Sequence, residues 1–253
     1  MLSDEQLQAI LPDVPAARRA RFLPFLQAAM TEFGIDRPAR EAAFVAQLAH
    51  ESGQFRYMEE IWGPTDQQRR YEPQTDLAAR LGNTEAGDGK RFKGRGPIQI
   101  TGRANYQRFG GLLGVDLVAE PERAATPDLA FRIAGLFWMK KGLNELADLA
   151  TSDAFREITR RINGGFNGLK DRERFYEAAR GVLGVRDAPV TRGRSRGGSR
   201  GAPTDAPTID DPSFERGHEA IRALAPRRRR QKRVGARKKT RRRTPGHRRR
   251  RRS

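Results

Sequence analysis

A glutamate lies at the end of an apolar helix pattern in the segment His50-Glu51-Ser52-Gly53. Phe44, Leu48 and Glu51 are spaced i, i+4 and i+7, so they share one face of a predicted helix. Burial and the negative end of the helix dipole both raise the pKa of a carboxyl at this place, which suits a general acid that keeps its proton near neutral pH. The alternative is a surface glutamate beside a helix end.

A second acidic motif, Glu59-Glu60, follows nine residues after Glu51. Gly53 is expected to break the helix, so the chain can fold back and bring Glu60 across a cleft from Glu51. Inverting glycosidases use such a pair, one acid and one base, about 6.5–9.5 Å apart with a water between them. The alternative is that Glu51 and Glu60 are simply two solvated charges. Glu59, next to Glu60, is a second candidate for the base.

Two glycine-rich segments could line such a site. Gly94 to Tyr106 alternates polar and apolar residues between glycines that allow close backbone approach to a ligand, and it could form a short strand along a groove. Ile162 to Gly168 combines two asparagines with three glycines, a plausible sugar-binding turn. A helix cap would explain these glycines but not both asparagines.

Four ordered motifs between Asp36 and Leu183 resemble glycoside hydrolase family 19. They are His50 to Gly53, Glu59-Glu60, Gly94 to Tyr106, and Ile162 to Gly168 followed by Asp171-Arg172. The resemblance implies a lysozyme-like, two-lobed, mainly α-helical domain with a small β element. It also implies hydrolysis, with inversion, of β-1,4 bonds next to N-acetylglucosamine.

The same resemblance implies a role for each matching residue. Glu51 would be the general acid and Glu60 the general base, and Thr101 takes the place of a residue that helps to hold the attacking water. The remaining matches are expected to bind substrate, and they are Gln99, Asn105, Asn163 and Arg172. Within this set Arg172 would be a charge that steadies the carboxylates.

Helix-period patterns dominate residues 1–185 and predict an all-α or mainly α domain. Asp36 is expected to cap the helix that carries Glu51, while the polar, turn-rich segment Gly63 to Gly96 predicts a long surface loop. Three further helices are predicted, one starting at Thr126-Pro127, one through Phe155 and Ile162, and one from about Asp171 to Leu183.

Charge is distributed unevenly along the chain, which has 50 Lys+Arg, 31 Asp+Glu and a formal net charge of +19. Residues 186–253 hold 24 basic and 6 acidic residues, so residues 1–185 are nearly neutral. The first part is long enough to bury a core. The second has too few large apolar residues to offset the entropy of ordering. We predict a family 19-like catalytic domain, residues 1–185, and a flexible Arg-rich tail, residues 186–253.

The absence of cysteine excludes disulfides, thiolate metal sites and a cysteine nucleophile. His50-Glu51 lacks a second histidine four residues on, because position 54 is Gln54, so we expect no metal and no cofactor. Asp4 and Glu5 stand where a signal peptide is basic. No stretch approaches the roughly 20 apolar residues of a membrane span.

These features favour a lysis enzyme over a secreted chitinase. We predict a monomeric endolysin that hydrolyses peptidoglycan, is made in the cytoplasm of a host bacterium and reaches the cell wall with help from another protein. A chitinase acting on N-acetylglucosamine polymers is the first alternative. A polyanion-binding protein with an inactive glycosidase-like domain is the second.

The tail predicts a second, electrostatic kind of binding. Pro226 to Ser253 contains 17 Lys+Arg in 28 residues and no acid. Such a run binds polyanions by counterion release, largely without sequence specificity. We expect anionic envelope polymers or lipopolysaccharide as partners. Non-specific binding of nucleic acid is an alternative. A tail without a selected function is the alternative.

Overall fold

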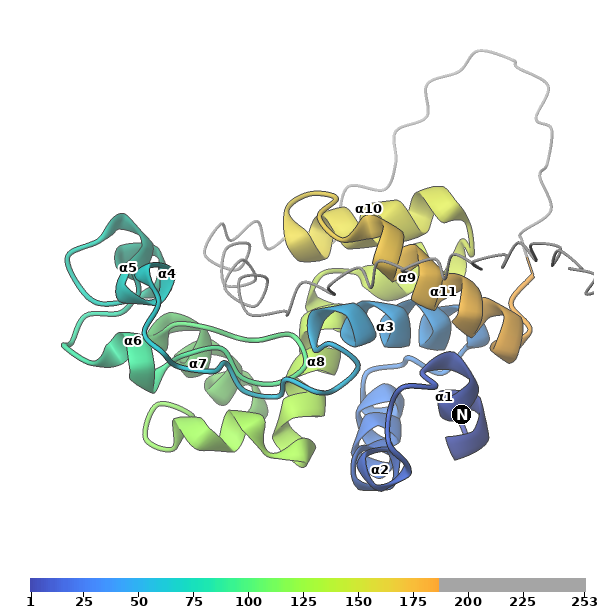
Figure 1. Ribbon diagram of the computed structural model, residues 1–253, viewed down its shortest axis with the longest axis horizontal. Helices are drawn as coiled ribbons and strands as arrows, with labels where there is room; N and C mark the ends of the chain where they lie inside the picture. The colour runs from blue at the N-terminus through green and yellow to red at the C-terminus, as the bar shows by residue number, and fades with distance from the viewer. Residues whose placement is uncertain (187–253) are drawn as a thin grey trace, which may run out of the picture.

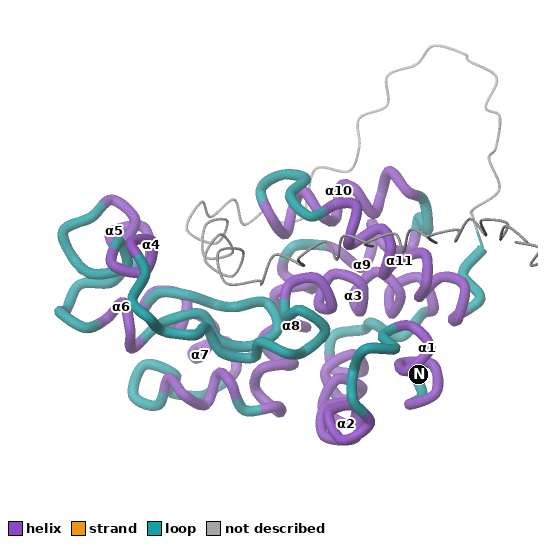
Figure 2. The backbone as a smooth tube through the Cα atoms, in the orientation of Figure 1, coloured by secondary structure: helices purple, strands orange, loops and turns teal. Residues whose placement is uncertain are grey.

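Helices account for the regular secondary structure of residues 1–186, the part of the chain that the computed structural model describes (Figures 1 and 2). In chain order they are α1 (Asp4–Ile10), α2 (Ala16–Glu32), α3 (Pro38–Glu51), α4 (Asp66–Arg69), α5 (Asp76–Leu81), α6 (Asp88–Arg91), α7 (Arg103–Leu113), the 3₁₀ helix η1 (Pro121–Ala125), α8 (Pro127–Lys140), α9 (Leu143–Asp148), α10 (Ser152–Asn163) and α11 (Leu169–Leu183). The predicted mainly α fold is confirmed. Apart from Arg186, the predicted basic tail lies outside the described residues.

The small β element is reduced to two isolated antiparallel bridges within residues 1–186. Glu59 pairs with Arg95, and Arg95 pairs with Ile100. The segment Gly94 to Tyr106 does not form the strand that its alternation suggested, because its second half begins α7. Gly102 makes this turn with φ +92°, where a Cβ would lie 2.5 Å from a backbone oxygen.

The beginning of α3 differs from the sequence expectation. Its N-cap is Arg37, whose side chain makes no capping hydrogen bond. Asp36 instead lies 3.5 Å from Arg40 as an ion pair, so its carboxylate is not used as a cap. By contrast Thr126 and Pro127 begin α8 as predicted.

The segment Gly63 to Gly96 is not one long loop, because α4, α5 and α6 lie within it. These helices have four to six residues each, too few to produce a periodic apolar pattern. Two of them carry a local start signal. The side chains of Thr65 and Thr75 accept hydrogen bonds from the backbone N–H groups three residues later, at 3.2 and 3.0 Å.

The helices gather into two groups, with α8 between them (Figure 1). One group contains α4 to α7, and the other contains α1 to α3 and α9 to α11. In the second group α11 packs along α3, and α2 of this group packs against α8. Residues 41–49 of α3 are all buried, so this helix is the centre of its group and holds Glu51 on a rigid support. None of the helices in residues 1–186 has the length and apolar content needed to cross a membrane.

Candidate active site

Glu51 is the last residue of α3, and its carboxylate binds the guanidinium of Arg172 on α11. Arg172 is fully buried and Glu51 is 6% exposed. Arg172 donates through Nη2 to Glu51 and through Nη1 to Oε1 of Gln47, the latter at 2.5 Å. Gln47 precedes Glu51 by one helical turn, so one guanidinium binds two side chains of the same helix face. The cation compensates the charge of a carboxylate held away from water.

A buried chain of hydrogen bonds continues from Gln47 into α10. The Gln47 amide donates to Oγ1 of Thr159 at 2.8 Å, and this hydroxyl donates to the carbonyl of Phe155 at 3.1 Å. Three helices are therefore tied together around Glu51. Neither Gln47 nor Thr159 was predicted as a site residue, although the sequence holds one signal: Gln47 is the one amide in the otherwise apolar run of residues 42–49.

His50 and Asp171 form a second link between the same two helices. His50 Nδ1 lies 2.8 Å from Asp171 Oδ2. Burial, followed by the charge of Arg172, lowers the pKa of His50, while Glu51 and Asp171 act in the opposite direction. Gly168 permits this contact, because a Cβ at its φ of +68° would overlap the His50 ring. Neighbouring residues on α3 therefore bind neighbouring residues on α11.

Glu60 lies on the connection that follows α3, and it is 4% exposed. Its carboxylate accepts the backbone N–H of Gly94 at 2.9 Å and the side-chain amide of Gln68 at 3.0 Å. Burial raises the pKa of Glu60, while these two hydrogen bonds and the charge of Lys93 oppose that shift. A buried carboxyl with a raised pKa is suited to exchanging a proton closer to neutral pH.

Glu59 has different surroundings from its neighbour. Its side chain is 44% exposed and pairs with Lys93 at 3.2 Å and Arg95 at 3.1 Å. Arg95 is itself buried and also donates to the hydroxyl of Tyr106 at 2.9 Å. Successive side chains of an extended segment point in opposite directions, which explains how adjacent glutamates reach such different partners. The two acids that the sequence offered as candidates for the base therefore have different surroundings in the structure.

Gln99, Thr101 and Asn105 form one hydrogen-bonded turn, and all three are buried. The Gln99 amide donates to the carbonyls of Gly96 at 2.7 Å and Tyr57 at 3.1 Å. Thr101 Oγ1 donates to the Gln99 carbonyl at 3.0 Å, and Asn105 donates to the Thr101 carbonyl at 2.7 Å. The turn is thereby attached to the chain segment that leads to Glu60.

Asn163 lies at the end of α10, where its amide donates to the carbonyl of Gly165 at 3.3 Å. The predicted site residues consequently fall into two sets. One set lies on α3, α10 and α11 and contains Glu51, Asn163 and Arg172. The other lies on α7 and the connections before it and contains Glu60, Gln99, Thr101 and Asn105. Residues 52–59 join the two sets along the chain.

The arrangement offers acid–base chemistry by carboxyl groups. One buried carboxylate is paired with a guanidinium, and another has a pKa raised by burial. Among residues 1–186, no three His, Asp or Glu side chains are grouped so that they could hold a metal ion. Glycoside hydrolases commonly use two carboxyl groups, so this pair is consistent with that class of enzyme.

Comparison with known proteins agrees with this class. The family model for class I chitinases matches residues 24–149. A glycosyl hydrolase family 19 domain-containing protein of Haemophilus influenzae is 35% identical over 177 residues, covering 60% of this chain and 84% of that protein. An endochitinase of Arabidopsis thaliana is 41% identical over 125 residues, covering 49% of this chain and 39% of that protein. The chain therefore spans well under half of this plant relative.

Solved structures show the same fold. Chitinase C from Streptomyces griseus superposes with a TM-score of 0.56 at 21% identity, over 74% of this chain and 95% of that one. A class IV chitinase from Zea mays gives a TM-score of 0.55 at 25% identity, over 74% and 94% of the two chains. The fold and the sequence matches define a chitinase-like glycoside hydrolase. The chain belongs to glycoside hydrolase family 19.

Proposed function

We propose that this protein is an endolysin that hydrolyses β-1,4 glycosidic bonds of bacterial peptidoglycan with inversion. Glu51 is the general acid and Glu60 is the general base. The observation that carries this proposal is the pair of buried carboxyl groups, nine residues apart, that belong to separate hydrogen-bonded sets. Inversion requires two carboxyl groups with a water between them, and residues on separate elements can leave that room.

Each group is held in place for its step by different partners. Arg172 fixes the carboxyl of Glu51, which transfers a proton to the oxygen of the leaving sugar. Glu60 takes a proton from water as that water attacks the anomeric carbon, and its raised pKa makes it a stronger base than an exposed glutamate. Thr101 helps to hold the water, and Gln99, Asn105 and Asn163 bind the sugars. These roles follow the family resemblance of the motifs.

Chitin is the second candidate substrate, because the Arabidopsis relative is named an endochitinase. The same acid, base and water would cleave either polymer, so the two activities must be separated by assay. Purified bacterial sacculi and colloidal chitin are incubated in parallel with the protein and with its Glu51→Gln variant. Mass analysis of the released fragments then identifies the new reducing end.

Release of muropeptides from sacculi by the parent protein, and not by Glu51→Gln, is the expected result. Fragments from chitin alone would assign the enzyme to the chitinases. Release by both proteins at equal rates would remove Glu51 from the mechanism. No release from either polymer by the folded protein would support the polyanion-binding alternative.

A further inference from the structure

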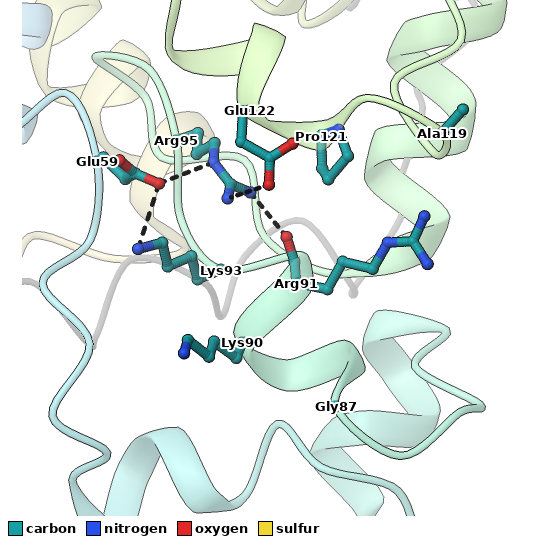
Figure 3. A pocket seen from close by; sticks show the side chains of 9 residues that line it. All are labelled: Glu59, Gly87, Lys90, Arg91, Lys93, Arg95, Ala119, Pro121 and Glu122. Carbon is teal, nitrogen blue, oxygen red and sulfur yellow. Dashed lines mark hydrogen bonds and ion pairs between the residues drawn. The ribbon is translucent and has the colours of Figure 1, made fainter.

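A pocket of about 570 Å³ lies between α6, the chain around Lys93 and Arg95, and the segment leading into η1 (Figure 3). Its walls carry four basic and two acidic side chains, and the lining residues are Glu59, Gly87, Lys90, Arg91, Lys93, Arg95, Ala119, Pro121 and Glu122. Its volume lies within the range of about 300–1,000 Å³ that is usual for small-ligand sites. None of the roles proposed above uses this pocket.

The two acids are already bound at one side of the pocket. Arg95 is 3% exposed and pairs with Glu59 at 3.1 Å and with Glu122 at 3.6 Å (Figure 3). It also donates to the Tyr106 hydroxyl and to the carbonyl of Arg91. Arg95 and its two carboxylates form a wall with a net formal charge of −1, which Lys93 balances through its ion pair with Glu59.

The remaining cations leave a positive excess. Lys93 pairs with Glu59 at 3.2 Å, an acid that it shares with Arg95. The Lys90 side chain is exposed and makes no hydrogen bond or ion pair within residues 1–186, and Arg91 donates to the neutral carbonyl of Val118 at 2.9 Å. Hydrogen bonds between a cation and a carboxylate are about twice as strong as neutral ones. The free groups are therefore suited to a ligand that carries carboxylates.

The pocket also shares a wall with the Glu60 site. Glu59 and Lys93 line the pocket, while the next residues along each segment, Glu60 and Gly94, are hydrogen-bonded to each other at 2.9 Å. A short peptide attached to a sugar beside Glu60 would span about 13 Å if four residues were extended. Adjacent Cα atoms are about 3.8 Å apart, so a stem of this length can reach from the Glu60 site to the neighbouring pocket.

We propose that this pocket binds the carboxylates of the peptide stem that muramic acid carries in peptidoglycan. The proposal rests on the proposed function and specifies its substrate. Chitin has no charged groups and would leave Lys90 unused. The stem has free carboxylates at several positions, which complement an excess of cations. The pocket then selects stem-bearing glycan over neutral polymers of N-acetylglucosamine.

The test uses the full-length chain, so that the basic tail is the same in every sample. Lys90→Gln removes the free charge from the pocket, and Lys140→Gln removes an exposed charge at the end of α8 as the matched control. KM and kcat are measured on soluble glycan strands that carry their stems and on the same strands after an amidase has removed them. Lys90→Gln should raise KM about 3- to 10-fold on stem-bearing strands, leave kcat unchanged, and have no effect on stripped strands. Lys140→Gln should match the parent on both.

A binding experiment keeps the proposal testable even if the enzyme does not cleave peptidoglycan. A soluble disaccharide-peptide is titrated into the parent protein and the two variants at physiological salt, and the Kd is measured by NMR. Weaker binding by Lys90→Gln, but not by Lys140→Gln, supports the proposal that the pocket binds the peptide stem. This result would hold even if the enzyme hydrolysed only chitin, in which case the proposed function fails but the binding site stands. Equal Kd values for all three proteins would overturn it. The proposal would also be overturned if inorganic phosphate displaced the disaccharide-peptide at one tenth of the concentration of the disaccharide-peptide itself.

Discussion

Arg172 of α11 and Glu51 of α3 form a buried ion pair between residues that are 121 positions apart in the sequence. The adjacent pair, His50 and Asp171, links the same two helices. The position of the proposed acid is therefore set by a helix from the far end of the domain. Any change that shifts α11 against α3 should affect both stability and turnover.

The first prediction concerns the two proposed catalytic carboxyl groups. Glu51→Gln keeps the shape of the side chain but removes the proton that can be transferred, so turnover should fall at least about 10²-fold. The fold should persist with a lower free energy of unfolding, because buried Arg172 keeps a neutral acceptor but loses its counter-charge. Glu60→Gln should be similarly severe. Glu59→Gln should be mild, because this side chain is half exposed and paired with Lys93 and Arg95. Circular dichroism and initial rates on sacculi check these outcomes, and a larger loss for Glu59→Gln than for Glu60→Gln would reassign the base.

The stereochemistry of the first product is a second prediction. A base that directs water to the face opposite the leaving group produces the inverted, α configuration at the new reducing end. Proton NMR of fresh product, recorded before mutarotation, distinguishes the α and β anomers. A β product, or a trapped glycosyl-enzyme adduct, would contradict the assignment of Glu60 as a base.

Stability should depend strongly on Arg172. Arg172→Met leaves the Glu51 carboxylate and the Gln47 carbonyl buried without their donor, so the free energy of unfolding should fall by about 3–5 kcal/mol. Arg174→Met is the control, because its guanidinium is 62% exposed and pairs with Asp171, and it should cost less than about 1 kcal/mol. Urea unfolding measures both values. Equal losses in the two variants would mean that the buried pair contributes no more than a surface one.

The acidic limb of the pH–rate profile should depend on Gln68. Its amide stabilises the ionised form of Glu60 and so lowers a pKa that burial raises. Gln68→Leu removes that donor, so the pKa of Glu60 should rise further and the acidic limb of kcat should move to higher pH. Gln67→Leu, on the same helix, is the control and should leave the limb in place. A limb that stays or moves to lower pH in Gln68→Leu would show that Glu60 does not control it.

Burial of Glu60 also predicts how its contribution to stability varies with pH. The folded-state pKa lies above the ordinary value of 4.5, so the folded protein holds this proton more tightly than the unfolded chain. The contribution is therefore most favourable below about pH 4.5 and is lost as the pH rises through the folded-state pKa. Urea unfolding of the parent and of Glu60→Gln, compared from below pH 4.5 to above the folded-state pKa of Glu60, measures this contribution to stability. A stability difference that is constant with pH would contradict the shift.

The basic tail gives a prediction from charge alone. Removing residues 186–253 eliminates +18 of the +19 formal charge and almost no large apolar surface. Hydrolysis of soluble oligosaccharides should survive, while binding to lipopolysaccharide-bearing envelopes should weaken. Binding by the full chain should fall steeply between low and physiological salt. Equal binding and lysis by both proteins at every salt concentration would make the tail dispensable for this role.

The sequence determined the local features of the fold. Periodic apolar positions located α3, α8, α10 and α11, because a helix of three or more turns repeats its buried face often enough to be recognised. The short helices α4, α5 and α6 escaped detection, since four to six residues contain no such repeat. Asp36 was expected to cap α3, but a nearby arginine provides a competing ion pair that a local pattern does not reveal.

The ordered motifs also identified the family and the candidate residues, because functional side chains and the glycines around them are consecutive in the chain. Their partners were decided by tertiary structure. Gln47, Thr159 and Arg172 come together only when α3, α10 and α11 pack. Glu60 differs from Glu59 in its surroundings only because Gln68 and Gly94 donate hydrogen bonds to Glu60 in the folded chain. Burial and hydrogen bonding depend on contacts between distant segments. A carboxyl group can therefore be recognised in the sequence, whereas its ionisation and its partners follow from the folded structure.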